Sequence, residues 1–370
     1  MENLEERKEN EKKFEIMIGK LKDPLVKKIL PRYVEVVRNK LPANFQIAKR
    51  IVFDFDKSLS TARLWNEHVK LMKKFYETKA VIDKKKLKIE DLETPRFSLI
   101  DLKILLARDI MKNCKMCERR CEVNRLEGEL GFCRVGDQCL ISSEFIHVGE
   151  EFYISPSHTI FFSGCSFNCQ FCQNFTISQW YESGVPVTAK MLANAIEVRR
   201  KERSRNVNFV GGEPTPQMMW ILETLKYCEV NIPTIWNSNM YMSKKTMSIL
   251  NGVVDMYLSD FKYGNNQCAS RLSKVKNFFE VCSRNHLLAA KQAELTVRHL
   301  VMPNHVECCT KPILEWISKN IQINSLVNIM NQFKPDFKAR EYSEINRAIT
   351  EEEYKQAIDH AKRLKINFII

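Results

Sequence analysis

The stretch from His158 to Cys172 reads HTIFFSGCSFNCQFC, a short apolar run followed at once by a loop with three cysteines. The run Thr159–Phe162 has the length and the residue types of a buried strand. From this point to the C-terminus, short apolar runs alternate with longer amphipathic stretches. This repeated alternation predicts an α/β fold built on a parallel sheet.

The alternation consists of six predicted strands and six predicted helices. The strands are Thr159–Phe162, Val207–Val210, Ile232–Trp236, Met256–Leu258, Leu295–Val301 and Leu326–Met330. The helices are Ala189–Arg203, Gln217–Tyr227, Lys244–Leu250, Ala269–Arg284, Lys311–Ile321 and Glu351–Arg363. Thr350 and Glu353 have the spacing of a capping box at the start of the last helix.

Two further parts precede this alternation, as expected for a chain of 370 residues. Residues 1–112 have apolar side chains at helical spacing, interrupted by prolines, and predict a helical extension. Residues 113–145 are rich in cysteine, glycine and arginine and predict a small metal-binding element. Residues 150–370 are then left for the main α/β domain.

Composition limits where the protein acts and what it binds. No apolar run approaches the roughly 20 residues that span a bilayer, and Met1 to Lys13 lacks the apolar core of a signal peptide. We therefore expect a cytoplasmic protein without a membrane partner, in which thirteen cysteines favour metal sites over disulfides. The net charge of +13 suggests nucleic acid, but interleaved lysines and glutamates favour an ordinary solvated surface.

The three cysteines of the opening stretch, Cys165, Cys169 and Cys172, have the spacing C-x3-C-x2-C. Three thiolates so close on one loop can ligate three irons of a cubane cluster, which four cysteines normally hold. The fourth iron would stay open to a substrate, as the open position of catalytic zinc does. A zinc site completed by a distant histidine, or simple packing, is the alternative. Zinc sites usually show paired C-x2-C units, which favours the cluster.

Spacing and context together resemble the radical S-adenosylmethionine (SAM) superfamily, and most closely proteins related to pyruvate formate-lyase activating enzyme. The resemblance covers about residues 114–364. It implies a partial (β/α)6 barrel, open on one side, and a [4Fe–4S] cluster on Cys165, Cys169 and Cys172 whose open iron binds the methionine end of SAM. It also implies that Phe171 lies against the adenine. Reductive cleavage of SAM then gives a 5′-deoxyadenosyl radical that abstracts hydrogen.

The second strand ends in Gly211-Gly212-Glu213-Pro214, about forty residues after the cysteine loop. Glycines let a backbone come close to a ligand, and a carboxylate suits an ammonium group. An ordinary strand-to-helix turn would have the same residues. The resemblance assigns Gly211, Gly212 and Glu213 to the methionine amino group of SAM.

Polar residues at the ends of later strands would face the same barrel mouth. By the resemblance, Asn237, Ser238 and Asp260 hold the cofactor or a monovalent cation, although the family often has an aspartate at the position of Asn237. Lys262 would contact the carboxylate or ribose of SAM, and Arg298 would lie near the active site. Surface salt bridges are the alternative for Lys262 and Arg298.

A second cysteine set lies in residues 113–145 and comprises Cys114, Cys117, Cys121 and Cys133. Four cysteines in twenty residues predict one four-coordinate metal site, either a structural zinc or an auxiliary iron–sulfur cluster. The remaining cysteines, among them Cys268, Cys308 and Cys309, show no ligand spacing. His305 is in the same loop as the last two and is a candidate acid–base residue.

We therefore expect a radical SAM enzyme that abstracts hydrogen from a polypeptide, as the resemblance to glycyl-radical activating enzymes implies, with an electron donor such as ferredoxin or flavodoxin. Modification of tRNA is the alternative that the net charge suggests. A non-catalytic protein with two zinc knuckles is the alternative of another class. Fold and cofactor do not fix the substrate.

Overall fold

The computed structural model describes residues 21, 23–56, 59–181 and 184–370. Its strands form one sheet in the order β3-β1-β2-β4-β5-β6-β7-β8-β9. The strands are β1 Leu140–His147, β2 Ser157–Phe162, β3 Val185–Pro186, β4 Val207–Gly211, β5 Thr234–Ser238, β6 Met256–Asp260, β7 Glu294–Leu300, β8 Leu326–Met330 and β9 Phe368–Ile369.

The sheet is parallel from β2 through β9, and only β1 pairs antiparallel, with β2 on one side and β3 on the other. The two ends of the strand order are not paired with each other among the described residues. The predicted fold class, a partial (β/α)6 barrel with a helical extension and a small cysteine-rich element, is confirmed. All six predicted strands are present within a few residues.

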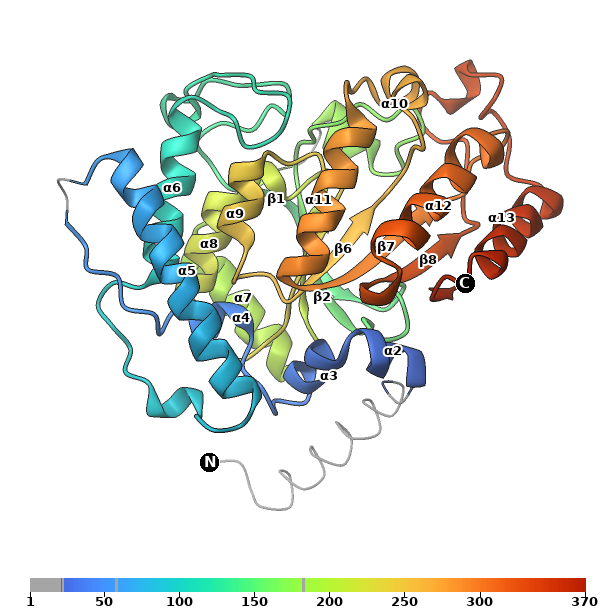
Figure 1. The fold of residues 1–370 in the computed structure, drawn as a ribbon. Helices are drawn as coiled ribbons and strands as arrows, with labels where there is room; N and C mark the ends of the chain where they lie inside the picture. Colours follow the sequence, from blue (N-terminus) through green and yellow to red (C-terminus); the bar gives the residue numbers. More distant parts are fainter. Residues whose placement is uncertain (1–20, 22, 57–58, 182–183) are drawn as a thin grey trace.

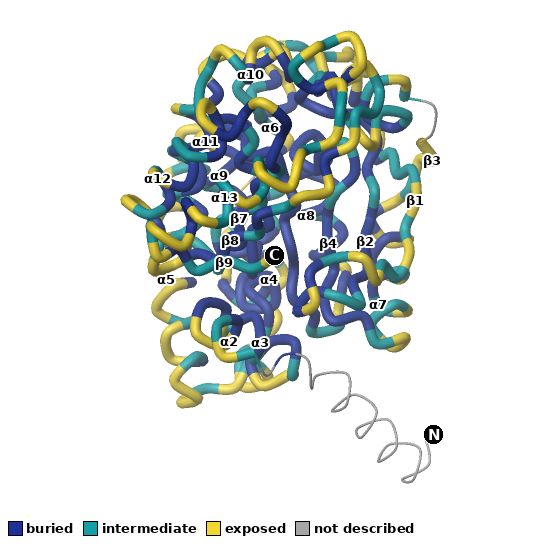
Figure 2. The backbone as a smooth tube through the Cα atoms, turned by 90° about the vertical axis from the view of Figure 1, so that its right-hand side faces the viewer, coloured by how far each residue is buried: buried dark blue, intermediate teal, exposed yellow. Residues whose placement is uncertain are grey.

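Helices follow the parallel strands and cover the outer face of the sheet (Figure 1). They are α7 Ala189–Lys201, α8 Met218–Tyr227, α9 Lys244–Leu250, α10 Asn266–Ser273, α11 Phe278–Gln292, α12 Lys311–Asn320 and α13 Glu351–Arg363. Figure 2 shows that the backbone of the central strands is buried, whereas exposed residues gather in the outer loops and helices.

Two sequence predictions were wrong in detail. The single helix predicted over Ala269–Arg284 is two helices, α10 and α11, because Lys274 and Asn277 adopt left-handed conformations with φ of 55° and 50°. Strand β1 was not predicted. Its residues are mostly half-buried, so its apolar pattern is weaker than that of the buried parallel strands.

Most of the predicted extension folds as helices α2 Pro24–Ile29, α3 Pro31–Val37, α4 Asn44–Ala48, α5 Thr61–Asp83 and α6 Leu99–Lys112. Residues 1–20, 22 and 57–58 of it lie outside the described residues. Apolar side chains of α2 and α3 form one core with Ile235, Leu258 and Leu326 of the strands. These two helices therefore close the end of the barrel at which the parallel strands begin (Figure 1). No described helix is long and apolar enough to cross a bilayer.

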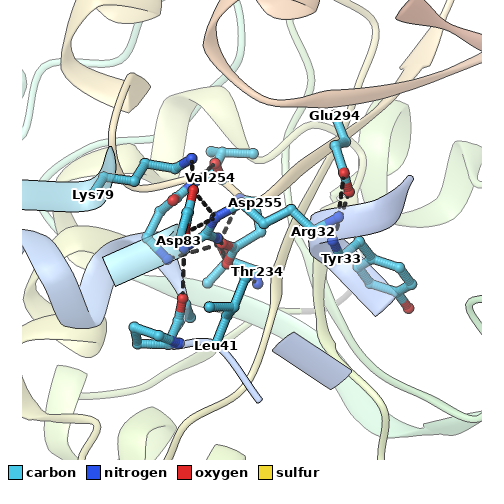
Figure 3. A network of polar contacts seen from close by, with 12 residues as sticks. Arg32, Tyr33, Leu41, Lys79, Asp83, Thr234, Val254, Asp255 and Glu294 are labelled. Carbon is cyan, nitrogen blue, oxygen red and sulfur yellow. Dashed lines mark hydrogen bonds and ion pairs between the residues drawn. The ribbon is translucent and has the colours of Figure 1, made fainter. Parts of the chain in front are cut away.

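A buried ion pair fixes α3 to this end of the barrel (Figure 3). The Arg32 guanidinium lies 3.1 Å from Asp255, directly before β6, and 3.2 Å from Asp83 at the end of α5. The backbone N–H groups of Arg32 and Tyr33 donate to the Glu294 carboxylate at 2.6 and 2.7 Å. Since Glu294 begins β7, these contacts place α3 across the starts of two neighbouring strands.

Candidate active site at the barrel mouth

The loop with the three cysteines leaves the carboxyl end of β2, where α/β barrels carry their chemistry. Cys165 and Cys169 are buried, and Cys172 is half-buried. Gly164 directly before the loop has φ of 88°, and a Cβ there would lie 2.5 Å from the carbonyl oxygen of Cys133. Only glycine fits this position, because the cysteine-rich element packs against it.

Each of the three sulfur atoms has a polar hydrogen-bond partner. Cys165 Sγ accepts from the backbone N–H of Phe167 at 3.3 Å. Cys169 Sγ accepts from Ser273 Oγ at 2.9 Å. Cys172 Sγ lies 3.2 Å from Ser178 Oγ. Hydrogen bonds to cysteine sulfur are a means by which proteins set the potential of iron–sulfur clusters. Three free thiols with such partners on one loop fit a [4Fe–4S] cluster.

Burial raises the pKa of all three thiols, that of Cys169 to about 12. Nearby Glu213 raises the pKa of Cys165 further, whereas Lys262 lowers that of Cys169. Buried thiols become thiolates where a metal offsets the cost of the charge. Without a metal, burial therefore favours the protonated thiols.

Gly211 and Gly212 bring the end of β4 against the cysteine loop. A Cβ on Gly211 would lie 2.1 Å from the backbone nitrogen of Phe162, and one on Gly212 would lie 2.2 Å from the carbonyl oxygen of Gly164. Gly211 also has φ of 115°. The two glycines thus permit a close backbone-to-backbone approach at the site.

The Glu213 carboxylate is buried and heavily hydrogen-bonded. It accepts from Thr215 Oγ1 at 2.5 Å, from Ser238 Oγ at 2.7 Å and from the backbone N–H of Asn239 at 2.9 Å. Burial raises the pKa of Glu213, and these hydrogen bonds oppose the shift. Glu213 therefore ties the end of β4 to the end of β5.

Asn239 continues this connection to the cysteine loop. Its side-chain amide donates to Ser166 Oγ at 3.0 Å and reaches Cys165 Sγ at 3.9 Å. The sequence analysis assigned Asn237 and Ser238 but missed Asn239, Ser178 and Ser273. The residue type alone offers no signal for these three, because the folded chain brings them to the sulfur atoms.

Asp260 and Lys262 form an ion pair at the end of β6, with Lys262 Nζ 2.6 Å from Asp260 Oδ2. Burial disfavours the ammonium, but Asp260 and Cys169 favour it, and the net pKa of Lys262 is raised. A positive charge is therefore held beside the cysteine loop. Asn237 on β5 is buried in the neighbouring strand and pairs in register with Leu258.

Arg298 lies beside Asp260 and Asn328 in the parallel register of β6, β7 and β8. Its guanidinium donates to both carboxylate oxygens of Glu151, at 2.7 and 2.6 Å, and pairs with Glu150. Asn328 donates to Glu151 at 2.8 Å. The sequence analysis missed Glu150 and Glu151, which lie in a loop before β2 and carry no motif.

Phe171 is buried between aromatic rings from two other strand ends. Its ring centroid lies 5.5 Å from that of Phe333 and 6.5 Å from that of Tyr263. Beyond it, Phe175, Trp180 and Phe337 form a second aromatic group, in which the Phe175 and Phe337 rings stack at 5.3 Å. The side chain of Trp180 is exposed in this group.

The cysteine-rich element packs beside the cysteine loop. Arg119 Nε donates to the carbonyl oxygen of Ser166 at 2.9 Å. Burial, followed by the charges of neighbouring cysteines, raises the pKa of Cys117. The predicted metal ligands of this element are Cys114, Cys117, Cys121 and Cys133. Among the residues that the structure describes, no three of these four sulfur atoms lie within 4.8 Å of one another.

Comparison with known proteins identifies the family of the chain. The family model for the radical SAM superfamily matches residues 159–317. A relative from Methanocaldococcus jannaschii, uncharacterized protein MJ0674, is 48% identical over 346 residues, which are 92% of this chain and 99% of the relative. The chain belongs to the radical SAM superfamily. It is thus an enzyme of a family that uses a [4Fe–4S] cluster and SAM.

Other proteins show weaker similarity to this radical SAM enzyme. Uncharacterized protein MJ0808 from the same organism is 26% identical over 212 residues, 52% of this chain and 61% of the relative. The structure of Streptococcus suis SuiB bound to precursor peptide SuiA gives a TM-score of 0.43 at 14% identity, and covers 55% of this chain and 46% of SuiB. The structure of QueE from Escherichia coli gives a TM-score of 0.37 at 13% identity. This match covers 62% of this chain and 92% of QueE.

Proposed function

We propose that Cys165, Cys169 and Cys172 hold the [4Fe–4S] cluster of this radical SAM enzyme and that its substrate is a polypeptide. The observation that carries the first part is the cysteine loop at the end of β2, in which each sulfur atom has a hydrogen-bond partner. When bound and reduced, the cluster supplies the electron that splits SAM into methionine and a 5′-deoxyadenosyl radical. That radical takes a hydrogen atom from the substrate.

The residues around the loop would bind SAM in defined ways. Lys262 is a half-buried cation beside Asp260 and the cysteine loop, and it suits the carboxylate of SAM. Gly211, Gly212 and Glu213 form the β4 edge of the site, and Asn237 and Ser238 form its β5 edge. Phe171 would contact the adenine. Arg298 is held by two glutamates, so we propose that it shapes the polar interior rather than pairing with SAM directly.

The choice of a polypeptide rests on the resemblance to activating enzymes and on two features of the mouth. The strand order leaves β3 and β9 as unpaired edges in the described chain, so the sheet gives lateral access. The group of Phe175, Trp180 and Phe337 lies beside the cysteine loop and presents one exposed ring, that of Trp180. Aromatic side chains are enriched where proteins bind one another.

The first experiment tests the cluster. Anaerobically reconstituted protein is reduced with dithionite, given SAM and assayed for 5′-deoxyadenosine. We expect product from the wild type and from Cys228→Ala, which changes a buried cysteine with no partner cysteine nearby, and none from the Cys165→Ala, Cys169→Ala, Cys172→Ala variant. Equal product from the triple variant would refute the assignment of these ligands.

A second experiment tests the substrate class. Cell extract is treated with nuclease or with protease, and each sample is tested for stimulation of 5′-deoxyadenosine formation. Stimulation that survives nuclease and is lost with protease supports a polypeptide. The reverse pattern, together with binding that weakens steeply with salt, would identify a nucleic acid instead.

A further inference from the structure

We propose a second metal site at the rim of the barrel, in which Cys268, His305 and Cys308 bind one divalent ion of the zinc type. The three ligand atoms all lie within 4.8 Å of one another. The sulfur atoms of Cys268 and Cys308 are 3.9 Å apart. A tetrahedral ion with Zn–S bonds of about 2.3 Å separates two sulfur ligands by about 3.8 Å. The two sulfur atoms therefore already have the separation that a single ion requires.

The histidine is held in the tautomer that binds a metal. Its Nδ1 lies 2.7 Å from the carbonyl oxygen of Pro303. Because a carbonyl can only accept, Nδ1 carries the proton and Nε2 keeps its lone pair. A backbone carbonyl on the other ring nitrogen is the usual support of a metal-binding histidine.

Asn265 contacts the thiol of Cys268 and the backbone of Cys308. Its side-chain nitrogen lies 3.4 Å from Cys268 Sγ and 2.8 Å from the carbonyl oxygen of Cys308. Its Oδ1 accepts from the backbone N–H of Cys268 at 2.8 Å, which caps α10. Asn265 thus fixes both the start of α10, which carries Cys268, and the backbone at Cys308.

Local backbone geometry explains how residues 37 positions apart meet. Cys268 lies in the first turn of α10, which follows β6. His305 directly precedes a π-helical turn, η6 Val306–Thr310, after β7, and Cys308 lies within it. A Cβ on Gly264 would lie 2.8 Å from the carbonyl oxygens of both Cys308 and Cys309. Glycine therefore lets the segment after β6 pack directly on this turn.

The ligand set leaves one coordination position open. Cys308 is exposed, whereas Cys309 is fully buried and lies outside the group of three. Two thiolates and one neutral imidazole balance the charge of a divalent ion. Zinc with three protein ligands takes water or an incoming ligand in its fourth position. We therefore expect an ion that can exchange its fourth ligand with solvent.

This site is distinct from the two other cysteine sets. Among the described residues, it is the one group of three ligands whose atoms are close enough for a single ion. It also lies on the same helix as a partner of the cysteine loop, because Ser273 ends α10 and donates to Cys169. Five residues of helix, about 7.5 Å of rise, separate Cys268 from Ser273.

Metal content and thiol protection test the proposal. The protein with its [4Fe–4S] cluster installed is incubated with zinc, desalted and analysed for zinc and iron. We expect Cys268→Ser and Cys308→Ser each to lose about one equivalent of zinc, with iron unchanged. In the wild type, zinc should protect Cys308 from alkylation, as measured on the proteolytic peptide that contains Cys308. A chelator should then restore alkylation of this cysteine. Asn265→Ala should weaken zinc binding about 10- to 100-fold.

Cys228→Ala is the matched control, since Cys228 is buried away from this group, and it should retain all of its zinc. Three outcomes would overturn the proposal. Zinc content could be the same in wild type and variants. Iron could fall together with zinc, which would place these cysteines in a cluster. Cys268 and Cys308 could resist alkylation until a reductant is added, which would show a disulfide instead of a metal site. Melting curves of Cys308→Ser, a change at an exposed position, confirm that the variant is folded.

Discussion

Ser273 donates its hydroxyl to the Sγ of Cys169 across 2.9 Å, although the two residues are 104 positions apart. The carbonyl oxygen of Ser273 also accepts a hydrogen bond from the backbone N–H of Asn168 at 3.1 Å. The end of α10 is therefore joined to the cysteine loop through both its backbone and its side chain. A helix that follows β6 thus helps to hold a loop that follows β2.

This contact predicts a change in cluster potential. A hydrogen bond to a cysteine ligand stabilises the reduced, more negative cluster, so Ser273→Ala should lower the reduction potential. About 1 kcal/mol of lost hydrogen-bond energy corresponds to a shift on the order of 40 mV for one electron. Redox titration followed by EPR measures it. Ser283→Ala is the control, because the hydroxyl of Ser283 is buried without a partner. An unchanged potential in Ser273→Ala would contradict the assigned role.

The sequence predicted β2 and β4 to β8 because most of their residues are buried and each strand contains a short apolar run. The two-residue strands β3 and β9 offer no such run and were not predicted. Lys244–Leu250 and Glu351–Arg363 were predicted with the bounds that the structure has. The break between α10 and α11 was missed because lysine and asparagine in left-handed conformations leave no mark in an amphipathic pattern. Burial and packing, rather than local propensity, decide that break.

The candidate site divides in the same way. Cysteines that lie close together on one loop can be recognised from their spacing in the sequence, so the cysteine loop could be predicted. Cys268 and His305 could not be grouped from the sequence. The chain between them forms the rest of α10, then α11 and β7, and only the turn at η6 brings His305 back beside Cys268. Glu150 and Glu151 are likewise defined only by their contacts with Arg298. Spacing predicts local sites, whereas tertiary structure alone creates the others.

Gly164 allows a prediction with a control of similar backbone geometry. Gly164→Ala would place a methyl 2.5 Å from the carbonyl oxygen of Cys133 at φ of 88°. The left-handed backbone costs about 1–2 kcal/mol, and the clash forces the cysteine loop and the cysteine-rich element apart. Gly128 has φ of 83°, but no atom lies within 4 Å of an added Cβ. Gly128→Ala should therefore lower the unfolding free energy only by the cost of the left-handed backbone. Denaturant unfolding and iron content compare them, and equal losses in both would show that the contact does not matter.

Lys103 and His68 predict acid sensitivity of the fold. Lys103 Nζ is buried and lies 3.0 Å from His68 Nε2, 2.9 Å from the carbonyl oxygen of Ile249 and 2.7 Å from that of Asn251. Burial, followed by the charge of Lys103, lowers the pKa of His68 to about 2. The ring must therefore accept from the lysine and stay neutral.

The direction of the pH dependence of stability follows from which state, folded or unfolded, binds a proton at His68. Below the ordinary histidine pKa of about 6.5 the unfolded chain takes up a proton at His68 that the folded chain refuses, so stability falls as pH drops from about 6.5 toward 2. The loss is at most about 1.4 kcal/mol per pH unit from this residue. His68→Gln keeps an acceptor but does not titrate, so its unfolding free energy should fall less between pH 7 and pH 5. Identical slopes would contradict a neutral His68.

The attachment of α3 to the barrel gives the last prediction. Asp255 is buried and accepts from Arg32, from the backbone N–H of Asn44 and from Thr234. Arg32→Met keeps the side-chain length but leaves the Asp255 charge without its cation. Breaking a buried pair in this way costs about 3–5 kcal/mol. Arg38→Ala is the control, since Arg38 lies 3.9 Å from Glu35 in an i,i+3 pair on the surface, where such pairs contribute about 0–1 kcal/mol.

A second variant separates loss of the pair from loss of packing. Asp255→Asn in the Arg32→Met background removes the uncompensated charge and keeps an oxygen for one of the two N–H groups, because Asn44 donates to Oδ1 and Thr234 to Oδ2. If the buried charge is the cause, the double variant should be more stable than Arg32→Met alone in urea unfolding. If the double variant is less stable still, the hydrogen bonds that the Asp255 carboxylate accepts from Asn44 and Thr234 contribute more than its unpaired charge costs. In that case the buried charge alone does not explain the loss in Arg32→Met.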